Sequence, residues 1–305
     1  MKAYLSILFA GLVVLFTTSG AYAQGCSDAG FCSINSLKPH AAGTGNQTKN
    51  QVKIGSFVGS ADNNISVFGA YAEYSRQINA RFAIDAKITS INQSGNGINM
   101  SGLGDVFLNA RIRTSAAVQL IGGLKIPLTS GNARLDGLSL PMDYQASLGT
   151  LDAIVGVTYQ LKNWQIMGAI QQPLTQNKNE FMASSHAMTS PLSMFQSTKN
   201  FQRAGDILVR VAYPIKAGSK WVFTPSLLPI YHLGADRFLN DITNKEEKIA
   251  GSEGLTLNGN LYADYTLSST SSLQVNLATP FIVRRSRPDG LTRSFIATIE
   301  YSYRF

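Results

Sequence analysis

The chain has 305 residues, of which 44% are hydrophobic and 14% charged, and its formal net charge is +8. This length fits one large domain or two ordinary ones. The positive charge is dispersed, with no basic run longer than Arg284-Arg285, so composition gives no support to nucleic-acid binding. The low charge and the 27 glycines are unusual for a water-soluble globular protein.

The first 23 residues have the pattern of a secretory signal peptide. Lys2 precedes an apolar core at 5–16, and the segment ends in Ala21-Tyr22-Ala23, a small-x-small cleavage site. The apolar run is shorter than the roughly 20 residues of a spanning helix, so a retained membrane anchor is the weaker alternative. A lipoprotein with a lipidated Cys26 is another, but the residues before Cys26 lack the usual leucine. We predict that residues 1–23 direct export.

Residues 24–49 form a polar segment that contains both cysteines of the chain, Cys26 and Cys32. In an oxidising compartment, two closely spaced cysteines predict one small-loop disulfide, with free thiols as the alternative. Two thiols without further ligands nearby do not make a closed zinc site, and a redox pair is more typically C-x-x-C. We therefore predict a periplasmic N-terminal segment with a Cys26–Cys32 disulfide.

From residue 50 onward, segments of alternating apolar and polar residues predict twelve β-strands. They cover 50–59, 66–76, 81–91, 104–113, 117–127, 147–161, 164–173, 204–214, 220–232, 254–267, 272–283 and 293–305. Each has about the ~9–11 residues that a tilted strand needs to cross a bilayer, or more. A soluble sandwich shows the same alternation with its apolar face inward, so alternation alone does not decide the fold.

The lengths of the connections favour a membrane barrel. Short connections at 77–80, 114–116, 162–163, 215–219 and 268–271 alternate with long polar ones at 92–103, 128–146, 174–203 and 233–253. Short turns on one side and long loops on the other are typical of outer-membrane β-barrels, as is a composition of low charge. We predict an all-β fold, a single antiparallel transmembrane barrel of about 12 strands over residues 50–305. Its short turns and both its ends would be periplasmic, and its long loops extracellular.

The end of the last predicted strand supports this interpretation. The run Tyr301-Ser302-Tyr303-Arg304-Phe305 has alternating aromatic residues and a terminal phenylalanine. It resembles the C-terminal strand of bacterial outer-membrane barrels, although a soluble sheet can end in the same way. The resemblance implies that Tyr301, Tyr303 and Phe305 form an assembly signal read by the barrel-assembly machinery. It also implies contact with outer-membrane lipid in the cell outer membrane of a Gram-negative bacterium.

Three predicted strands begin with a glycine-containing stretch and an aspartate, namely Asp105, Asp152 and Asp206. We favour capping of nearby backbone N–H groups by these aspartates over a ring of carboxylates at the mouth. The stretch from Gly102-Leu103-Gly104-Asp105 to Arg113 resembles the "GLGD" strand start of the outer-membrane barrel family named for the meta-pathway of phenol degradation. That resemblance implies passage of small, often hydrophobic compounds, broadly as FadL-like channels do.

If the apolar faces point to lipid, fourteen charged residues line the lumen. They are Lys53, Glu73, Asp85, Lys87, Asp105, Arg111, Arg113, Lys125, Asp152, Asp206, Arg210, Asp264, Glu300 and Arg304. An open pore selective for one ion would carry a charge bias, whereas the balanced signs here fit a salt-bridged interior as well as a permeation path. Residues 24–50 either fold into the lumen as a plug or hang in the periplasm, and the sequence does not choose between them.

The sequence assigns no catalytic, cofactor-binding or metal-binding residue. Hydrolysis by a nucleophilic serine needs a histidine base, and of His40, His186 and His232 only the last is near a strand end. No barrel-hydrolase motif surrounds it, so we favour an interfacial side chain beside Tyr231 over a lipid hydrolase. No phosphate or dinucleotide motif is present.

The predicted function is passive, porin-like uptake of small hydrophobic or amphipathic solutes through an outer-membrane channel. The alternative is a closed structural or adhesive barrel that acts through its extracellular loops, chiefly 174–202 and 233–254.

Overall fold

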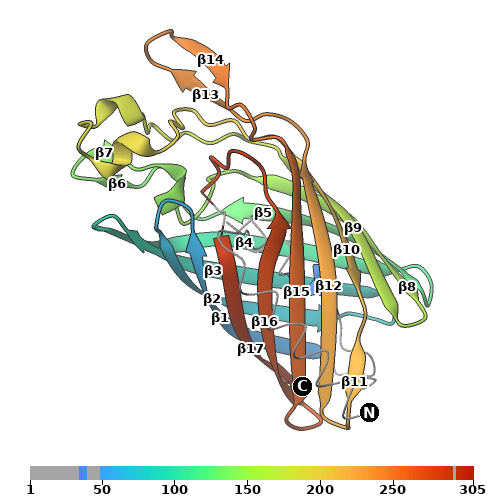
Figure 1. Ribbon diagram of the computed structural model, residues 1–305. Helices are drawn as coiled ribbons and strands as arrows, with labels where there is room; N and C mark the ends of the chain where they lie inside the picture. Colours follow the sequence, from blue (N-terminus) through green and yellow to red (C-terminus); the bar gives the residue numbers. More distant parts are fainter. Residues whose placement is uncertain (1–33, 40–48, 291–292) are drawn as a thin grey trace.

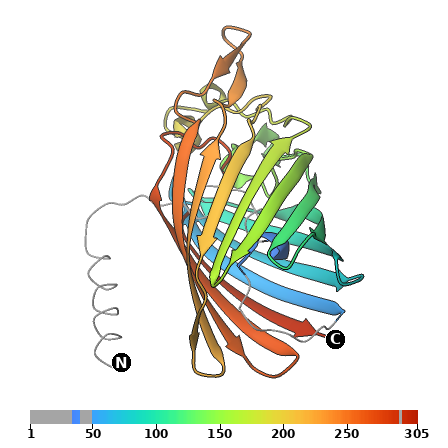
Figure 2. The same ribbon diagram turned by 90° about the vertical axis from the view of Figure 1, so that its right-hand side faces the viewer.

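The computed structural model describes residues 34–39, 49–290 and 293–305 of the chain, and their fold is all-β (Figures 1 and 2). Twelve antiparallel strand positions close into a barrel. In chain order they are β1 (Asn50–Ala61), β2 (Ser66–Gln77), β3 (Phe82–Gly95), β4 (Ile98–Arg113), β5 (Val118–Pro127), β8 (Asp152–Leu161), β9 (Trp164–Pro173), β10 (Asp206–Ala212), β12 (Trp221–His232), β15 (Gly254–Thr266), β16 (Ser271–Ile282) and β17 (Arg293–Arg304). The short β11 (Ile215–Ala217) continues the course of β10 after Tyr213-Pro214 and pairs with β12.

The first and last strands close the wall. β1 pairs with β17 from Gln51↔Arg304 onward, and the N–H of Asn50 donates to the carbonyl of Phe305 at 3.0 Å. On the other side β10 pairs with β12, so the twelve described strands form a closed ring. Closure matters because an open edge would leave backbone groups without partners in a membrane. Asn50 and Phe305 thereby lie at the same end, together with the tight turns; we call this the turn end and the opposite one the loop end.

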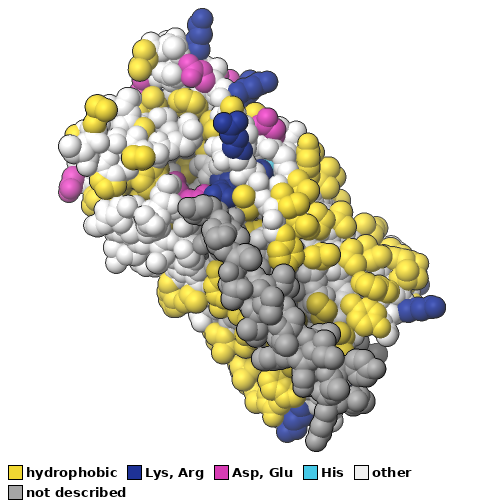
Figure 3. All heavy atoms as spheres, in the orientation of Figure 1, with side chains coloured by type: hydrophobic (Ala, Val, Ile, Leu, Met, Phe, Trp, Pro, Cys, Tyr) yellow, Lys and Arg dark blue, Asp and Glu magenta, His cyan; other side chains and the backbone are white. Residues whose placement is uncertain are grey.

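Apolar side chains cover the outside of the wall rather than its inside. Ile54, Val155 and Phe281 are 62%, 65% and 65% exposed. Figure 3 shows hydrophobic side chains over the outer wall, with most charged side chains near the loop end and a few Lys or Arg side chains near the turn end. The alternate residues of the same strands point inward, as Lys53, Ile154 and Pro280 do. A soluble sandwich would have the opposite arrangement, so this burial pattern identifies a membrane barrel. Among the described residues, no helix is long and apolar enough to cross a membrane.

The structure corrects three of the predicted boundaries. Residues 92–103 are not a long loop, because β3 and β4 continue as a hairpin beyond the barrel and turn at Asn96-Gly97. Both turn residues have positive φ, 53° and 78°, as an Asn-Gly hairpin turn requires. Residues 147–151, predicted as the start of a strand, belong to the preceding loop, and residues 215–217, predicted as a turn, form β11.

Loops close the loop end with a hydrophobic core of their own. This core joins Ile65, Val67, Ile91 and Ile98 of the barrel hairpins to Leu140, Met142, Tyr144, Leu148, Phe181, Leu192, Phe195, Phe201 and Ile249 of the loops. The loops carry β6 (Arg134–Leu135), β7 (Leu138–Ser139), β13 (Arg237–Asn240), β14 (Lys245–Lys248), and the 3-10 turns η3 (Met142–Tyr144), η4 (Ala183–Ser185) and η5 (Pro191–Met194). We call loop residues 128–151, 174–205 and 233–253 the lid. The β13–β14 hairpin projects from it (Figure 1).

Candidate functional site

One half of the lumen wall carries a cluster of buried apolar side chains. Side chains from six neighbouring strands form it, namely Phe107, Ile121, Ile154, Met167, Ala169, Leu208, Leu228 and Ile230. These residues were not predicted to line the lumen, because apolar side chains were assigned to the lipid-facing side of each strand. A signal for them was present, since runs such as Val106-Phe107-Leu108 and Leu227-Leu228 are apolar on both faces of the strand, and such runs indicate burial on both sides.

The opposite half of the wall, built by β1, β2, β3, β15, β16 and β17, is polar and charged. Nζ of Lys53 lies 3.0 Å from Oε1 of Glu300, and the hydroxyl of Tyr71 donates to Oε2 of Glu300 at 2.6 Å. Nζ of Lys87 lies 4.1 Å from the centroid of the Tyr71 ring, over its face, where a cation is attracted by the ring electrons. Glu73 is buried in the same wall, opposite Lys53 and Lys87 in the strand register.

A short segment of the N-terminal region, Ile34–Pro39, lies between the two walls; we call it the plug. Ile34 and Leu37, at either end of the turn η2 (Asn35–Leu37), are completely or almost completely buried in the apolar wall. Nζ of Lys38 reaches the polar wall and lies 2.7 Å from Oε2 of Glu300. A guanidinium nitrogen of Arg210 donates to the carbonyl of Leu37. The plug thus matches the two-sided lumen, with aliphatic side chains on one wall and its charge on the other.

Other predicted lumen residues form ion pairs across neighbouring strands. Arg111 binds Asp85 with two hydrogen bonds, at 2.7 and 3.0 Å, and Nζ of Lys125 lies 2.7 Å from Oδ2 of Asp152. Oδ1 of Asp264 accepts from Gln274 at 2.8 Å. Arg113 is exposed at the turn end, and Arg304 is half-buried there.

The three aspartates at strand starts have different side-chain partners. Asp105 accepts from the hydroxyl of Ser147 at 2.5 Å, Asp152 from Gln171 and Lys125, and Asp206 from Arg203. In the "GLGD" stretch, Gly104 lies where a Cβ would come within 2.4 Å of the Thr89 hydroxyl and 3.0 Å of the Ala146 carbonyl. Here β4 bulges against β3, and the glycine lets the lid approach the strand.

A buried charge network ties the lid to the mouth of the barrel. Nδ1 of His232 lies 2.7 Å from Asp206, and Nε2 lies 2.8 Å from Asp236. Arg203 binds Asp206, and Arg284 binds Asp289 at 2.9 Å. Burial holds back the ionisation of Asp289, but the adjacent Arg284 and Arg203 outweigh it and keep the pKa of Asp289 below its usual value.

The expectation of an interfacial His232 is therefore wrong. Tyr231 is 51% exposed on the outer face, and His232, the next residue, points inward and is 1% exposed. Carboxylates only accept hydrogen bonds, so both ring nitrogens of His232 act as donors here. A ring engaged in this way has no nitrogen left to take a proton from a serine, which places His232 in the network and outside hydrolytic chemistry. Within the described part of the chain, no group of three or more His, Cys, Asp or Glu side chains is arranged to hold a metal ion.

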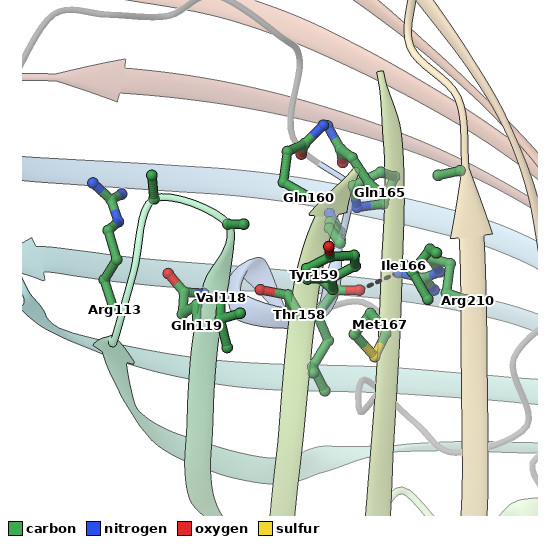
Figure 4. Close-up of a pocket in the computed structure, with 16 residues that line it drawn as sticks. Arg113, Val118, Gln119, Thr158, Tyr159, Gln160, Gln165, Ile166, Met167 and Arg210 are labelled. Atoms are coloured by element: carbon green, nitrogen blue, oxygen red, sulfur yellow. Dashed lines mark hydrogen bonds between the residues drawn. The ribbon is translucent and has the colours of Figure 1, made fainter. Parts of the chain in front are cut away.

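A cavity of about 200 Å³ lies between the plug and the wall at the turn end (Figure 4). Its walls include Lys38, Arg113 and Arg210, the polar side chains of Gln119, Thr158 and Gln165, and the apolar Met167 and Leu37. None of its lining residues is acidic. The cavity is therefore cationic on one side and apolar on the other.

The predicted signal peptide 1–23, His40 and the proposed Cys26–Cys32 disulfide lie outside the described residues. The structure describes the predicted assembly residues Tyr301, Tyr303 and Phe305, which are 41%, 45% and 55% exposed at the turn end. Their role in assembly stays a prediction.

Known structures share the fold. An outer membrane channel from Pseudomonas putida F1 matches with a TM-score of 0.59 and 12% identity, over 88% of this chain and 100% of that one. The translocator domain of an autotransporter from Neisseria meningitidis matches with a TM-score of 0.51 and 10% identity, over 86% and 90% of the two chains. A FadL homologue from Pseudomonas aeruginosa matches more distantly, with a TM-score of 0.41 and 10% identity, over 86% and 91%.

No family model and no curated protein matches the chain. At these identities the likeness shows the fold, which is that of Gram-negative outer-membrane β-barrels. Together with the apolar outer belt, this fold locates the protein in the cell outer membrane of a Gram-negative bacterium.

Proposed function

We propose that the protein is an outer-membrane channel for passive uptake of small solutes that are hydrophobic or amphipathic. The observation that carries the proposal is the two-sided lumen, with an apolar wall that includes Phe107, Met167 and Leu208 facing the polar wall around Glu300. A water-filled porin lumen is polar, whereas this one offers an apolar surface beside hydrogen-bonding groups. The resemblance of residues 102–113 to the phenol-degradation barrel family points to the same class of solute.

In this mechanism the solute moves down its concentration gradient and the chain supplies only a path. The lid controls entry at the loop end, and the plug leaves the lumen or shifts within it to let the solute reach the turn end. The apolar wall replaces water around the hydrophobic part of the solute, and the polar wall keeps its own ion pairs, such as Lys53–Glu300 at 3.0 Å. No covalent chemistry is required of any side chain.

Reconstitution of the full chain into liposomes tests the proposal. We expect faster entry of a neutral aromatic probe than into protein-free liposomes. Met167→Gln, which keeps the side-chain length but makes the wall polar, should slow this entry several-fold. The matched control is Ile242→Gln in the lid, because Ile242 is 83% exposed and lies far from the wall in sequence and fold. A reconstituted barrel that speeds neither probe entry nor ion conduction contradicts the channel.

The second candidate is a closed barrel that binds a partner through its loops. It is favoured by the packed core of the lid and by the β13–β14 hairpin, which projects beyond that core. In that case a deletion confined to the lid would abolish partner binding and leave solute permeability as it was. Loss of probe entry in the Met167→Gln protein with binding intact would argue against it.

A further inference from the structure

The side chain of Arg210 extends over the inner face of the neighbouring strand. Arg210 is buried on β10, and its Cζ lies 5.9 Å from the ring centroid of Tyr262 on β15. β12 lies between β10 and β15 in the barrel, so the guanidinium lies over the lumen side of β12. The inward residues of β12 at this level are Thr224, opposite Tyr262, and Ser226, opposite Ala212.

These inward side chains are buried hydrogen-bond donors. Thr224 and Ser226 are 1% and 6% exposed, and Asn260, opposite Ser226 on β15, is 8% exposed. Among the described residues, the two hydroxyls and Nδ2 of Asn260 have no hydrogen-bond partner. Burying such groups without a partner is unfavourable, so a row of three beside a guanidinium indicates a ligand whose oxygens accept hydrogen bonds.

An apolar surface adjoins this donor row. Met167 lies opposite Arg210 on β9, and Leu208 is the preceding inward residue of β10; both are buried. Ile34 and Leu37 of the plug cover this surface. Because Arg210 donates to the Leu37 carbonyl, the plug presents to this place an apolar body and an acceptor oxygen, which are the two features a ligand would need.

The charges around this donor row favour an anionic ligand. Of the barrel residues that line the adjoining cavity at the turn end, Arg113 and Arg210 are basic and none is acidic (Figure 4). Asp264 lies in the same inward row of β15 as Tyr262, but its carboxylate is engaged by Gln274. Guanidinium groups and carboxylates form strong, geometrically matched hydrogen bonds.

We propose that Arg210, Thr224, Ser226 and Asn260 bind the carboxylate of a small amphipathic acid, whose apolar body packs where Ile34 and Leu37 now lie. The proposal rests on the channel function and assigns its solute class, a small organic acid with an apolar body. Ligand and plug compete for one surface, so ligand binding displaces the plug.

Equilibrium dialysis of the full chain in nanodiscs tests this site, with empty nanodiscs as the blank. The probes are 2-naphthoate and its neutral analogue 2-naphthylmethanol. We expect naphthoate to bind about tenfold more tightly than the alcohol, as charge-assisted hydrogen bonds would give. Arg210→Gln should remove this preference, and Leu37→Asn, which weakens the competing plug, should tighten naphthoate binding several-fold.

Two further variants keep the test decisive. Arg210→Lys keeps the charge but loses the paired hydrogen bonds of the guanidinium, so its preference for naphthoate over the alcohol should be intermediate. This variant replaces Arg210→Gln in the test if the glutamine variant does not give the β-sheet circular dichroism of the folded barrel. Arg285→Gln, an exposed arginine at the loop end, should change nothing. Equal affinity for both probes, or undiminished naphthoate binding in a folded Arg210→Gln protein, overturns the site. Equilibrium dialysis measures binding and does not require transport of solute through the barrel. A barrel that binds naphthoate but passes no solute would therefore refute the channel function and still support the binding site.

Discussion

The two ends of the lumen are closed in different ways. At the loop end, nine buried loop residues pack with the barrel hairpins into one hydrophobic core. Side-chain hydrogen bonds reinforce it, such as those from Asn179 to the carbonyls of Gly131 and Leu140, both at 3.0 Å. At the turn end, the plug contributes Ile34 and Leu37 to the apolar wall and Lys38 to one ion pair, and its Leu37 carbonyl accepts from Arg210.

This difference in size implies a difference in ease of opening. Burying a large aliphatic side chain contributes about 1.5–3 kcal/mol, and ordering one residue of backbone costs about 1–2 kcal/mol. For the six plug residues, burial of Ile34 and Leu37 contributes about 3–6 kcal/mol against an ordering cost of about 6–12 kcal/mol. The plug therefore also depends on the Lys38–Glu300 ion pair and on the hydrogen bond from Arg210 to the Leu37 carbonyl. The lid, in contrast, packs nine loop side chains into one core with the barrel hairpins. We infer that the plug opens more readily than the lid, which controls entry at the loop end.

The largest expected effect comes from the core of the lid. Phe181 is 1% exposed. Phe181→Ala should lower the stability of the closed lid by about 3–5 kcal/mol, because removal of a buried aromatic side chain leaves a cavity. Hydrogen exchange of amides in 174–203 should speed up accordingly, while the barrel strands keep their protection. Met188→Ala, at a residue 96% exposed, is the control and should stay within about 0.5 kcal/mol. Unchanged exchange in Phe181→Ala would show that the lid has no cooperative core.

Next in size is the network at the mouth. His232→Ala leaves the buried carboxylates of Asp206 and Asp236 without their shared partner, and breaking a buried charged contact costs about 3 kcal/mol or more. Thermal unfolding in detergent, followed by circular dichroism, should show a lower midpoint, with Lys245→Ala on the exposed hairpin as control. An unfolding midpoint equal to that of the parent protein would show that the network does not stabilise the lid.

The plug should respond to a smaller change. Leu37→Asn loses the burial of one side chain, about 2 kcal/mol, which is more than tenfold in the ratio of bound to released plug. Hydrogen exchange at residues 34–39 should therefore increase by that factor without any change in the lid. If the lid amides lose protection as well, the two closures are coupled and the contrast between them fails.

A further expected effect is a pH dependence of the lid. Burial raises the pKa of Asp143 from 3.8 to about 7, and the neighbouring Asp62 and Asp289 add to this effect. Between these two values the closed lid binds more protons than the open one, so its stability falls as pH rises through the window. Lid amides should exchange faster at pH 8 than at pH 5 after correction for intrinsic rates. Asp143→Asn should reduce the difference, and a lid more stable at pH 8 would contradict the assignment.

The barrel could be predicted because its signal is local. Residues such as Leu255, Leu257 and Leu261 alternate with polar neighbours, and the outward positions need only lipid as their partner. The 92–103 hairpin was missed because its polar residues resembled a loop; Gln93 is in fact buried under the lid, donating to the Gln145 carbonyl at 2.8 Å.

The site was less predictable because it depends on contacts between distant segments. The sequence marks Arg210 and Glu300 as inward charges, but not that Leu37 and Lys38 contact them from more than 170 and 260 residues away. Likewise, Arg203, Asp236 and Asp289 lie in loops whose positions no strand pattern specifies. The inward apolar residues were not predicted, because a strand with apolar side chains on both faces shows no alternation that identifies its lumen-facing side.

Solute flux through plug variants tests the central claim most directly. Liposomes with the parent protein, Leu37→Asn or Ile242→Asn would be compared for entry of a small aromatic probe. We predict that Leu37→Asn passes the probe several-fold faster than the parent protein, while Ile242→Asn, altered at an exposed lid residue, equals the parent. Equal rates in all three, or none above protein-free liposomes, would contradict a lumen that is closed by a removable plug.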